Sequence, residues 1–137
     1  MRVIVTGSRD WIDRVTVNQQ LSMLNWHAEG SLVVVHGCAD GADRIAEQWV
    51  HATRSRGFLG VTEEAHPARW NEFKLSAGPM RNAEMVNAGA DLVLAFLNRC
   101  KKPTCTRTGI HGSHGAMNCV QLARAAGIKV QVYQGDM

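Results

Sequence analysis

Three short segments of this sequence combine glycines with polar side chains in a way that suits phosphate binding. They are TGSRDW at residues 6–11, HGCADGADR at 36–44 and HGSHGAMN at 111–118. Glycine allows positive φ and brings backbone N–H groups close to an anion. A helix that begins just after such a loop adds unpaired N–H groups and partial positive charge. One such loop could simply end a strand, but three together favour an anion-binding crevice.

Side chains within and near these segments could complete a ligand site. Ser8 could donate a hydroxyl, and Arg9 carries a guanidinium fork that suits phosphate. Asp43 could accept from a ribose hydroxyl or simply compensate a helix dipole, and Asp40 could cap the same helix. The predicted ligand-binding residues are Gly7, Ser8, Arg9, Gly37, Gly41, Ala42, Asp43, Arg81, Asn82, Gly112, Ser113, His114, Gly115 and Asn118.

Arg81 and the tryptophans could contact a ligand, or could have only a structural role. Arg81 falls in the first turn of a predicted helix, where a cation is mildly unfavourable, so it has reason to bind something; simple surface placement is the alternative. Trp70 could stack on a base or close the core, and the core is the preferred interpretation. Trp11, Trp26 and Trp49 are also expected to pack inward, although Trp11 could flank a ligand.

A second kind of chemistry is suggested by Cys100, Cys105, His111 and His114. Two cysteines and two histidines are a zinc-ligand set, and a metal could order an otherwise unstructured loop of about 15 residues. The spacing matches no common zinc pattern, however. His114 could instead serve the ligand, and Cys100 could end a strand. Zinc is therefore left open, no other cofactor is required, and Cys38 and Cys119 are expected to be small buried thiols.

The bulk composition restricts the partners. The chain has 137 residues and a net charge of +3, yet no acidic residue lies between Asp91 and Asp136. That basic third suggests an anionic partner, or else a solvated loop. No apolar run is long enough for a membrane span. The N-terminal residues resemble a strand rather than a signal peptide, which predicts a cytoplasmic protein whose cysteines are thiols or metal ligands rather than disulfides.

The elements that must position these residues alternate between strand and helix. Apolar runs predict strands at 2–6, 31–37, 58–67, 91–97 and 128–133. Helical periodicity predicts helices over 14–28, 41–57, 78–89 and 116–127. This order predicts a single α/β domain over 1–137, with a Rossmann-like doubly wound fold of about five mostly parallel strands and helices on both faces. Ligands in such folds bind at the carboxyl ends of the strands.

The ordered motifs resemble a known family. VIVTGSRDW, VVHGCADGADRIAEQW, HPARW…GPMRNAEMV…GADLVLAF and GSHGAMNCVQLARAAGI are similar to the YspA/cpYpsA-related (YAcAr) branch of the SLOG superfamily, over residues 2 to 132. The superfamily also holds the LOG phosphoribohydrolases and the DNA-processing protein DprA. The resemblance implies a bacterial or phage protein with a Rossmann-like sheet that binds nucleotide-derived ligands, often as a homodimer.

The LOG motifs sharpen this expectation. Arg81 matches the arginine of the LOG pattern M-x-x-R-K, but Asn82 stands in place of its lysine. Residues 115–118 align with G-T-x-E, which puts Asn118 at the catalytic glutamate, and the preceding P-G-G is absent. An asparagine cannot transfer a proton as a carboxylate does. The protein is therefore expected to bind rather than cleave; if it is an enzyme, Arg81 and His114 are the catalytic candidates.

Three functions follow in order of preference. The first is sensing or sequestering a phosphate-bearing nucleotide derivative, either ADP-ribose-like or a nucleoside phosphate. The second is a LOG-type nucleotide N-glycosidase or phosphoribohydrolase. The third is single-stranded nucleic-acid binding of the DprA type, which the basic C-terminal third would support. The expected partners are a small molecule and a second copy of the chain, with no membrane.

Overall fold

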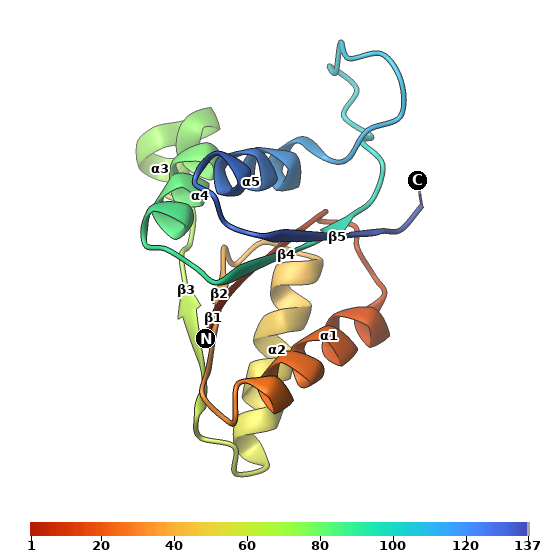
Figure 1. Ribbon diagram of the computed structural model, residues 1–137. Coiled ribbons are helices and arrows are strands. Elements are labelled where there is room, and N and C mark those ends of the chain that lie inside the picture. Colours follow the sequence, from red (N-terminus) through yellow and green to blue (C-terminus); the bar gives the residue numbers. More distant parts are fainter. Residues whose placement is uncertain (137) are drawn as a thin grey trace.

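A five-stranded, entirely parallel sheet forms the centre of the computed structural model, which describes residues 1–136 (Figure 1). The strands lie in the order β3-β2-β1-β4-β5. Their bounds are β1 Arg2–Gly7, β2 Leu32–His36, β3 Val61–Ala65, β4 Leu92–Leu97 and β5 Val130–Gln134. The predicted Rossmann-like α/β class is confirmed.

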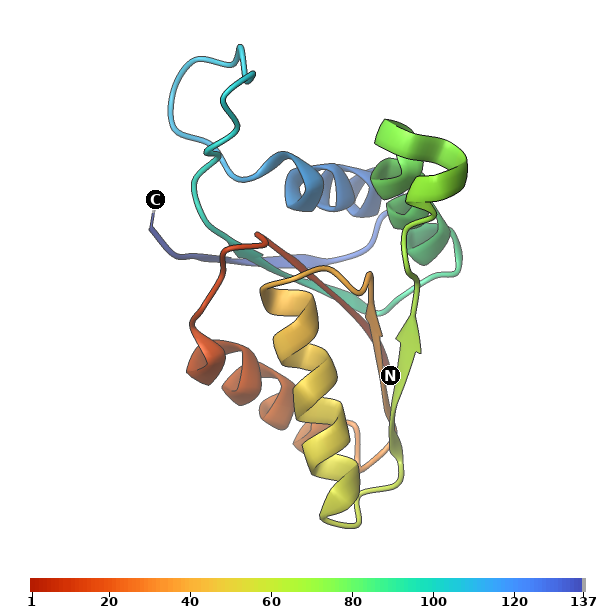
Figure 2. The same cartoon turned by 180° about the vertical axis from the view of Figure 1, so that it is seen from behind.

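Helices cover both faces of the sheet, as Figures 1 and 2 show from opposite sides. α1 (Arg14–His27) and α2 (Ala42–Ser55) lie on one face. α4 (Ala77–Asn87) and α5 (His114–Ala125) lie on the other, with the short α3 (Trp70–Phe73) and the 3₁₀ turn η1 (Lys74–Ser76) beside them. From β1 the chain continues outward to β2 and β3, and then returns to the other side of β1 for β4 and β5. The order in which strands are added to the sheet therefore reverses between β1 and β4.

The core divides accordingly into clusters on the two faces. β4 is buried along its whole length, as a central strand covered on both sides should be. On the α1–α2 face, Phe96 is fully buried and stacks on Tyr133 with ring centroids 5.0 Å apart. On the α4–α5 face, Ile4 and Met85 are buried together with Cys119. These clusters make the sheet a rigid base for the loops at its edge.

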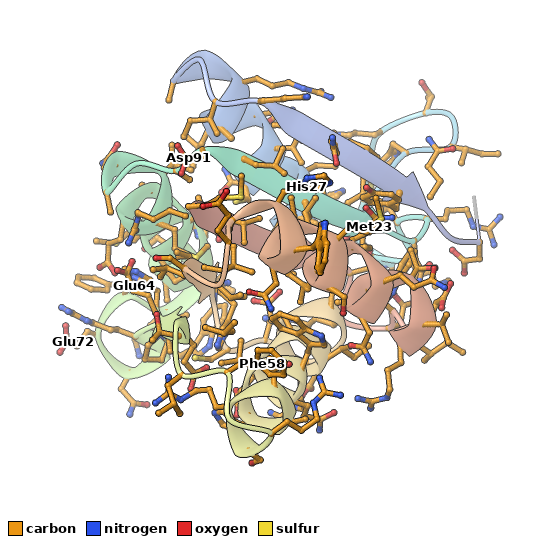
Figure 3. All side chains as sticks on the ribbon, turned by 60° about the horizontal axis from the view of Figure 1, so that its bottom comes forward. Met23, His27, Phe58, Glu64, Glu72 and Asp91 are labelled. Carbon is orange, nitrogen blue, oxygen red and sulfur yellow. The ribbon has the colours of Figure 1, made fainter. Side chains whose placement is uncertain are left out.

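Several predicted boundaries and environments are wrong. The third strand is shorter than 58–67, and α3 and η1 lie between it and the predicted helix 78–89, where the sequence pattern predicts no helix. α4 begins two residues before Pro79, and α5 begins at His114 rather than at 116. Trp26 is 83% exposed because it lies nine residues from the buried Val17, half a turn away around α1. The position of α1 can be found in Figure 3 from Met23 and His27, which belong to the same helix.

An ion pair ties β1 to the edge strand β3. Both guanidinium Nη atoms of Arg2 donate to the carboxylate of Glu64, at 2.9 and 2.8 Å. With His66 as a further partner, Arg2 lowers the pKa of Glu64 to about 2. Since the folded pKa is depressed, the stabilisation is complete above the unfolded pKa, near 4.3, and disappears as pH falls to about 2.

This pair gives a pH-dependent prediction. We expect Glu64→Gln to lower the free energy of unfolding at pH 7 by about 1 kcal/mol, because the pair is partly screened by solvent. The difference from the parent should shrink as the pH of urea-unfolding measurements is lowered from 5 towards 2. Glu72→Gln is the control (both residues are labelled in Figure 3), because Glu72 has no ion pair within residues 1–136. Equal, pH-independent effects of the two substitutions would contradict the prediction.

Candidate functional site

A cavity of about 820 Å³ opens at the carboxyl ends of β1 and β4, where the strand order reverses. Its size lies within the range typical of small-molecule sites, roughly 300–1,000 Å³, and its place is the one at which doubly wound folds bind ligands. The residues that line it are Thr6, Gly7, Arg9, Asp10, Ala39, Asp43, Trp70, Leu75, Gly78, Pro79, Arg81, Asn82, Arg99, Cys100, Lys101, Lys102, Ser113, His114, Gly115, Ala116 and Asn118.

The cavity brings together most of the predicted ligand residues. Those that line it are Gly7, Arg9, Asp43, Arg81, Asn82, Ser113, His114, Gly115 and Asn118. The predicted residues that do not line it are Ser8, Gly37, Gly41, Ala42 and Gly112. Of these, Ser8, Gly37 and Gly41 contact residues of other loops or helices instead.

Ser8 links the loop after β1 to β4 and α5. Its side chain is buried, and its hydroxyl accepts the N–H of Asn98 at 2.8 Å. The same hydroxyl lies 2.7 Å from that of Ser113, the residue that precedes α5. Ser8 therefore fixes the distance between two of the glycine loops rather than facing the cavity.

Gly7 and Gly41 allow the β1 loop to pack on the start of α2. A Cβ at Gly7 would lie 2.6 Å from the Cβ of Ala42 and 2.7 Å from the carbonyl oxygen of Phe96. Gly41 has φ of +80°, and a Cβ there would overlap the carbonyl oxygen of Ser8. Such crowding by backbone leaves room for glycine alone. Both glycines are required by packing, whatever the cavity binds.

Asp43 organises the turn after β2 from the first turn of α2. Its buried carboxylate accepts the N–H of Gly37 at 2.8 Å and the more distant N–H of Ala39 at 3.5 Å. Burial raises the pKa of Asp43, while the Gly37 N–H and the charge of Arg81 oppose that rise. The predicted cap by Asp40 is wrong: Gly41 is the N-cap residue without a side-chain bond, and Asp40 pairs with Arg44 at 3.4 Å.

Arg81 reaches across the cavity floor from α4 to the same turn. Its Nη1 donates to the carbonyl oxygen of Gly37, and its Nε donates to Oδ1 of Asn82 at 2.8 Å. A Cβ at Gly37 would overlap this guanidinium, so a larger residue there would displace the Arg81 side chain from its present position. A guanidinium has five N–H groups, and within residues 1–136 the Nη2 group makes no hydrogen bond, so it is available to an anion in the cavity.

The two asparagines at the LOG lysine and glutamate positions bond to each other. Nδ2 of Asn82 donates to Oδ1 of Asn118 at 2.9 Å and to the carbonyl oxygen of Gly115 at 3.1 Å. Asn82 is buried, and this link joins α4 to α5. A neutral amide pair thus occupies the place where the LOG pattern would put a lysine and a glutamate. Neither amide can act as a general acid or base.

The start of α5 offers backbone donors to the cavity. Residues 113–116 line it, Ser113 makes no side-chain cap bond, and the first turn of α5 has no acidic residue. The first N–H groups of a helix have no partner within it, so they are open to an anion. Loss of hydration and the nearby Lys102 and Arg107 lower the pKa of His114, which keeps its imidazole neutral at pH 7.

The structure adds residues to the cavity that the sequence did not assign to it. Trp70 was expected in the core, but it is 46% exposed, and the guanidinium of Arg9 lies 5.6 Å from its ring centroid. Arg99, Lys101 and Lys102 also line the cavity. Only the general excess of basic residues after Asp91 could have indicated them. Arg9, Arg81 and these three give five cations against the two carboxylates of Asp10 and Asp43.

Other candidate sites differ in chemistry. A second cavity of about 540 Å³ at the same sheet edge is lined by Asp10, Asp13 and Asp136 with Lys101 as its one cation, which disfavours an anion. Lys101 already donates to Asp10 and Asp136 at 2.6 and 2.5 Å.

The four metal-type side chains Cys100, Cys105, His111 and His114 lie close together, as a zinc site would require. Cys119 is buried as expected, and burial raises its pKa to about 11, but Cys38 is only half-buried.

Within residues 1–136, none of the helices combines the length and the apolar character that a membrane crossing requires.

Comparison with known proteins finds a similar sequence, a similar solved structure and a matching family. The chain is 45% identical over 130 residues to the Gene 61 protein of Mycobacterium phage D29, which covers 94% of this chain and 93% of that protein. The solved structure of DNA processing protein A (DprA) from Streptococcus pneumoniae superposes with a TM-score of 0.57 at 16% identity. That superposition covers 99% of this chain but only 51% of DprA, so this chain spans about half of DprA. The family described as YspA, cpYpsA-related SLOG matches residues 1–73. The chain belongs to the YspA, cpYpsA-related SLOG family.

Proposed function

We propose that the protein binds a phosphate-bearing nucleotide derivative, ADP-ribose-like or a nucleoside phosphate, in the cavity at the carboxyl ends of β1 and β4, and so senses or sequesters it. The observation that carries the proposal is the lining itself. Five cations, the unpaired N–H groups at the start of α5 and an exposed tryptophan surround one cavity of about 820 Å³.

Different lining residues suit different parts of such a ligand. A phosphate would accept from the N–H groups at the start of α5 and from Nη2 of Arg81. A base would stack on Trp70, whose ring is half-exposed and already has Arg9 over it. Asp43 would not serve the ribose, because its carboxylate is buried and occupied by backbone N–H groups. This division assigns charge recognition to α4 and α5 and base recognition to α3.

Isothermal titration with ADP-ribose, AMP and adenosine tests the proposal. We expect the two phosphate-bearing compounds to bind, and adenosine to bind at least tenfold more weakly, since a charge-assisted hydrogen bond contributes about 1.5–3 kcal/mol. Mass spectrometry of small molecules released from purified protein would identify the natural ligand. The absence of any binding or thermal shift across nucleotides and ADP-ribose derivatives would refute the proposal.

The role of Trp70 gives a variant test. Trp70→Leu should weaken ADP-ribose binding about tenfold, because loss of a stacked aromatic costs about 1–3 kcal/mol. Trp26→Leu is the matched control, since Trp26 is exposed on α1 and does not line the cavity. An equal effect of both substitutions, measured by titration, would remove Trp70 from the site.

A LOG-type hydrolase is the second candidate, because Arg81 and His114 both line the cavity. The amide pair Asn82–Asn118 opposes it. Release of free base from nucleoside monophosphates, followed by chromatography, decides between the two; turnover that is lost in Arg81→Lys would favour the enzyme.

Single-stranded nucleic acid is the third candidate, supported by the cationic lining and by the fold shared with DprA. This function predicts an affinity for oligonucleotides that falls steeply as the salt concentration rises. Such affinity without nucleotide binding would replace the first proposal.

A further inference from the structure

The segment 98–113, between β4 and α5, projects away from the sheet (Figures 1 and 2). It contains no helix or strand, and its ends are joined by one antiparallel bridge between Arg99 and Gly112. In this bridge the N–H of Cys100 donates to the His111 carbonyl oxygen at 2.7 Å and the N–H of Ser113 donates to the Asn98 carbonyl oxygen at 3.2 Å. From residue 101 to 110, Cys105 is the one side chain that is not exposed. Fixing the backbone of each residue opposes folding by roughly 1–2 kcal/mol through lost conformational entropy. Apolar burial does not offset that loss here.

Four half-buried, metal-type side chains gather where this loop meets the rest of the protein. One ligand atom from each of Cys100, Cys105, His111 and His114 lies within 4.8 Å of all the others. Sγ of Cys105 lies 3.4 Å from Nε2 of His111 and 3.2 Å from Nε2 of His114. A tetrahedral zinc ion with Zn–S of about 2.3 Å and Zn–N of about 2.0 Å holds sulfur and nitrogen ligands about 3.5 Å apart. The cluster therefore has the dimensions of a zinc site.

Hydrogen bonding accounts for only part of this arrangement, because the bonds within the cluster join Cys105 to the two histidines and leave out Cys100. Nδ1 of His111 lies 3.1 Å from the carbonyl oxygen of Gly109, which can only accept, so Nδ1 carries the proton. The lone pair of Nε2 then faces Cys105. A backbone carbonyl that orients an imidazole in this way is typical of metal-binding histidines. A Cys105 thiol could donate to Nε2 of His111 and accept an N–H from Nε2 of His114, but neither bond explains why the sulfur of Cys100 lies at the same point.

We propose that Cys100, Cys105, His111 and His114 bind one zinc ion. The two cysteines bind as thiolates and release their protons to solvent, and the histidines bind as neutral imidazoles. Sulfur ligands select zinc over magnesium and calcium. Four protein ligands leave no open position, so the ion is structural rather than catalytic.

The zinc site connects the loop to the cavity. Cys100 and His114 line the cavity, together with Lys101 and Lys102, which follow Cys100 directly. A zinc ion fixes the start of this basic segment against the first residue of α5. It also occupies His114, which removes that imidazole as a general base for a LOG-type reaction.

Zinc content tests the proposal directly and does not depend on the nucleotide ligand. Protein made without an affinity tag and kept reduced should contain about one zinc ion per chain by elemental mass spectrometry. Cys105→Ser should retain less than about a fifth of that amount, since loss of a ligand thiolate abolishes tight binding. Cys38→Ser is the matched control, because Cys38 is also half-buried but lies outside the cluster, and it should keep the full content.

Limited proteolysis provides a second readout. Arg107 lies in the exposed part of the loop, whereas the bond after Lys102 precedes Pro103 and resists trypsin. A zinc chelator should accelerate cleavage after Arg107 at least about tenfold in the parent protein, because release of the metal raises the population of open loop. Cys105→Ser should be cleaved rapidly with or without chelator. Absence of zinc from the parent, zinc retained by Cys105→Ser, or a disulfide between Cys100 and Cys105 in freshly isolated protein would each overturn the proposal.

Discussion

Replacement of Asp43 by alanine is expected to lower the free energy of unfolding by about 3 kcal/mol. The buried carboxylate accepts the Gly37 N–H at 2.8 Å, and its loss leaves that donor unsatisfied. Arg81 also loses a compensating negative charge in its surroundings. Both effects act on the turn after β2, at the cavity wall. We therefore expect weaker ADP-ribose binding in addition to lower stability.

Two further variants separate these contributions. Asp43→Asn keeps an acceptor oxygen and removes the charge, so its loss should be smaller than that of Asp43→Ala. Asp40 lies in the same loop, is exposed, and within residues 1–136 forms an ion pair with Arg44 alone. Asp40→Ala should therefore change stability by less than about 0.5 kcal/mol. Urea unfolding at pH 7 measures all three. An Asp43→Ala protein as stable as Asp40→Ala would show that the buried carboxylate does not hold the turn.

Gly41→Ala is expected to destabilise the protein by about 3 kcal/mol or more, since it adds positive-φ strain to a steric overlap. Gly41 has φ of +80°, and its added Cβ would overlap the backbone of Ser8. Relief of that overlap would move the β1 loop away from α2 and disturb the bond between Ser8 and Asn98.

The matched glycine is Gly57, at the end of α2. Its φ is +100°, but a Cβ there would meet no atom within 4 Å, so Gly57→Ala should suffer from backbone strain alone, about 1 kcal/mol. Thermal unfolding of the two variants compares strain with and without overlap. Equal melting temperatures of the two variants would mean that the β1 loop moves aside without loss of stability. Close packing would then not explain the glycine at position 41.

The parts of the site that the sequence predicts are those that depend on local pattern. Apolar runs indicate the strands, and strand ends indicate where Gly7, Arg9 and Ser113 must gather. The roles of Ser8 and Gly41 could not be predicted, because a small polar residue and a glycine suit a phosphate loop and a close backbone contact equally well. Only the approach of the β1 loop to α2 and β4 distinguishes them.

Other residues depended on contacts between distant elements. Asn82 and Asn118 are 36 positions apart, and their bond exists because α4 packs on α5. The sequence favours a core position for Trp70 over a ligand contact, but α3 holds it at the cavity beside Arg9. The convergence of Cys105 with His111 and His114 likewise depends on the fold of the loop, since their spacing in sequence matches no common pattern.

The position of β1 in the sheet has a consequence for synthesis on the ribosome. β1 and β2 can pair as soon as the first third of the chain has emerged, but the other edge of β1 pairs with β4, and Ser8 meets Asn98, 90 residues later. Until then β1 exposes an unpaired apolar edge, which invites association between nascent chains. The cavity is also incomplete until that late pairing. A ligand that needs both walls can therefore stabilise only the finished protein, and its binding reports that the central strands have joined.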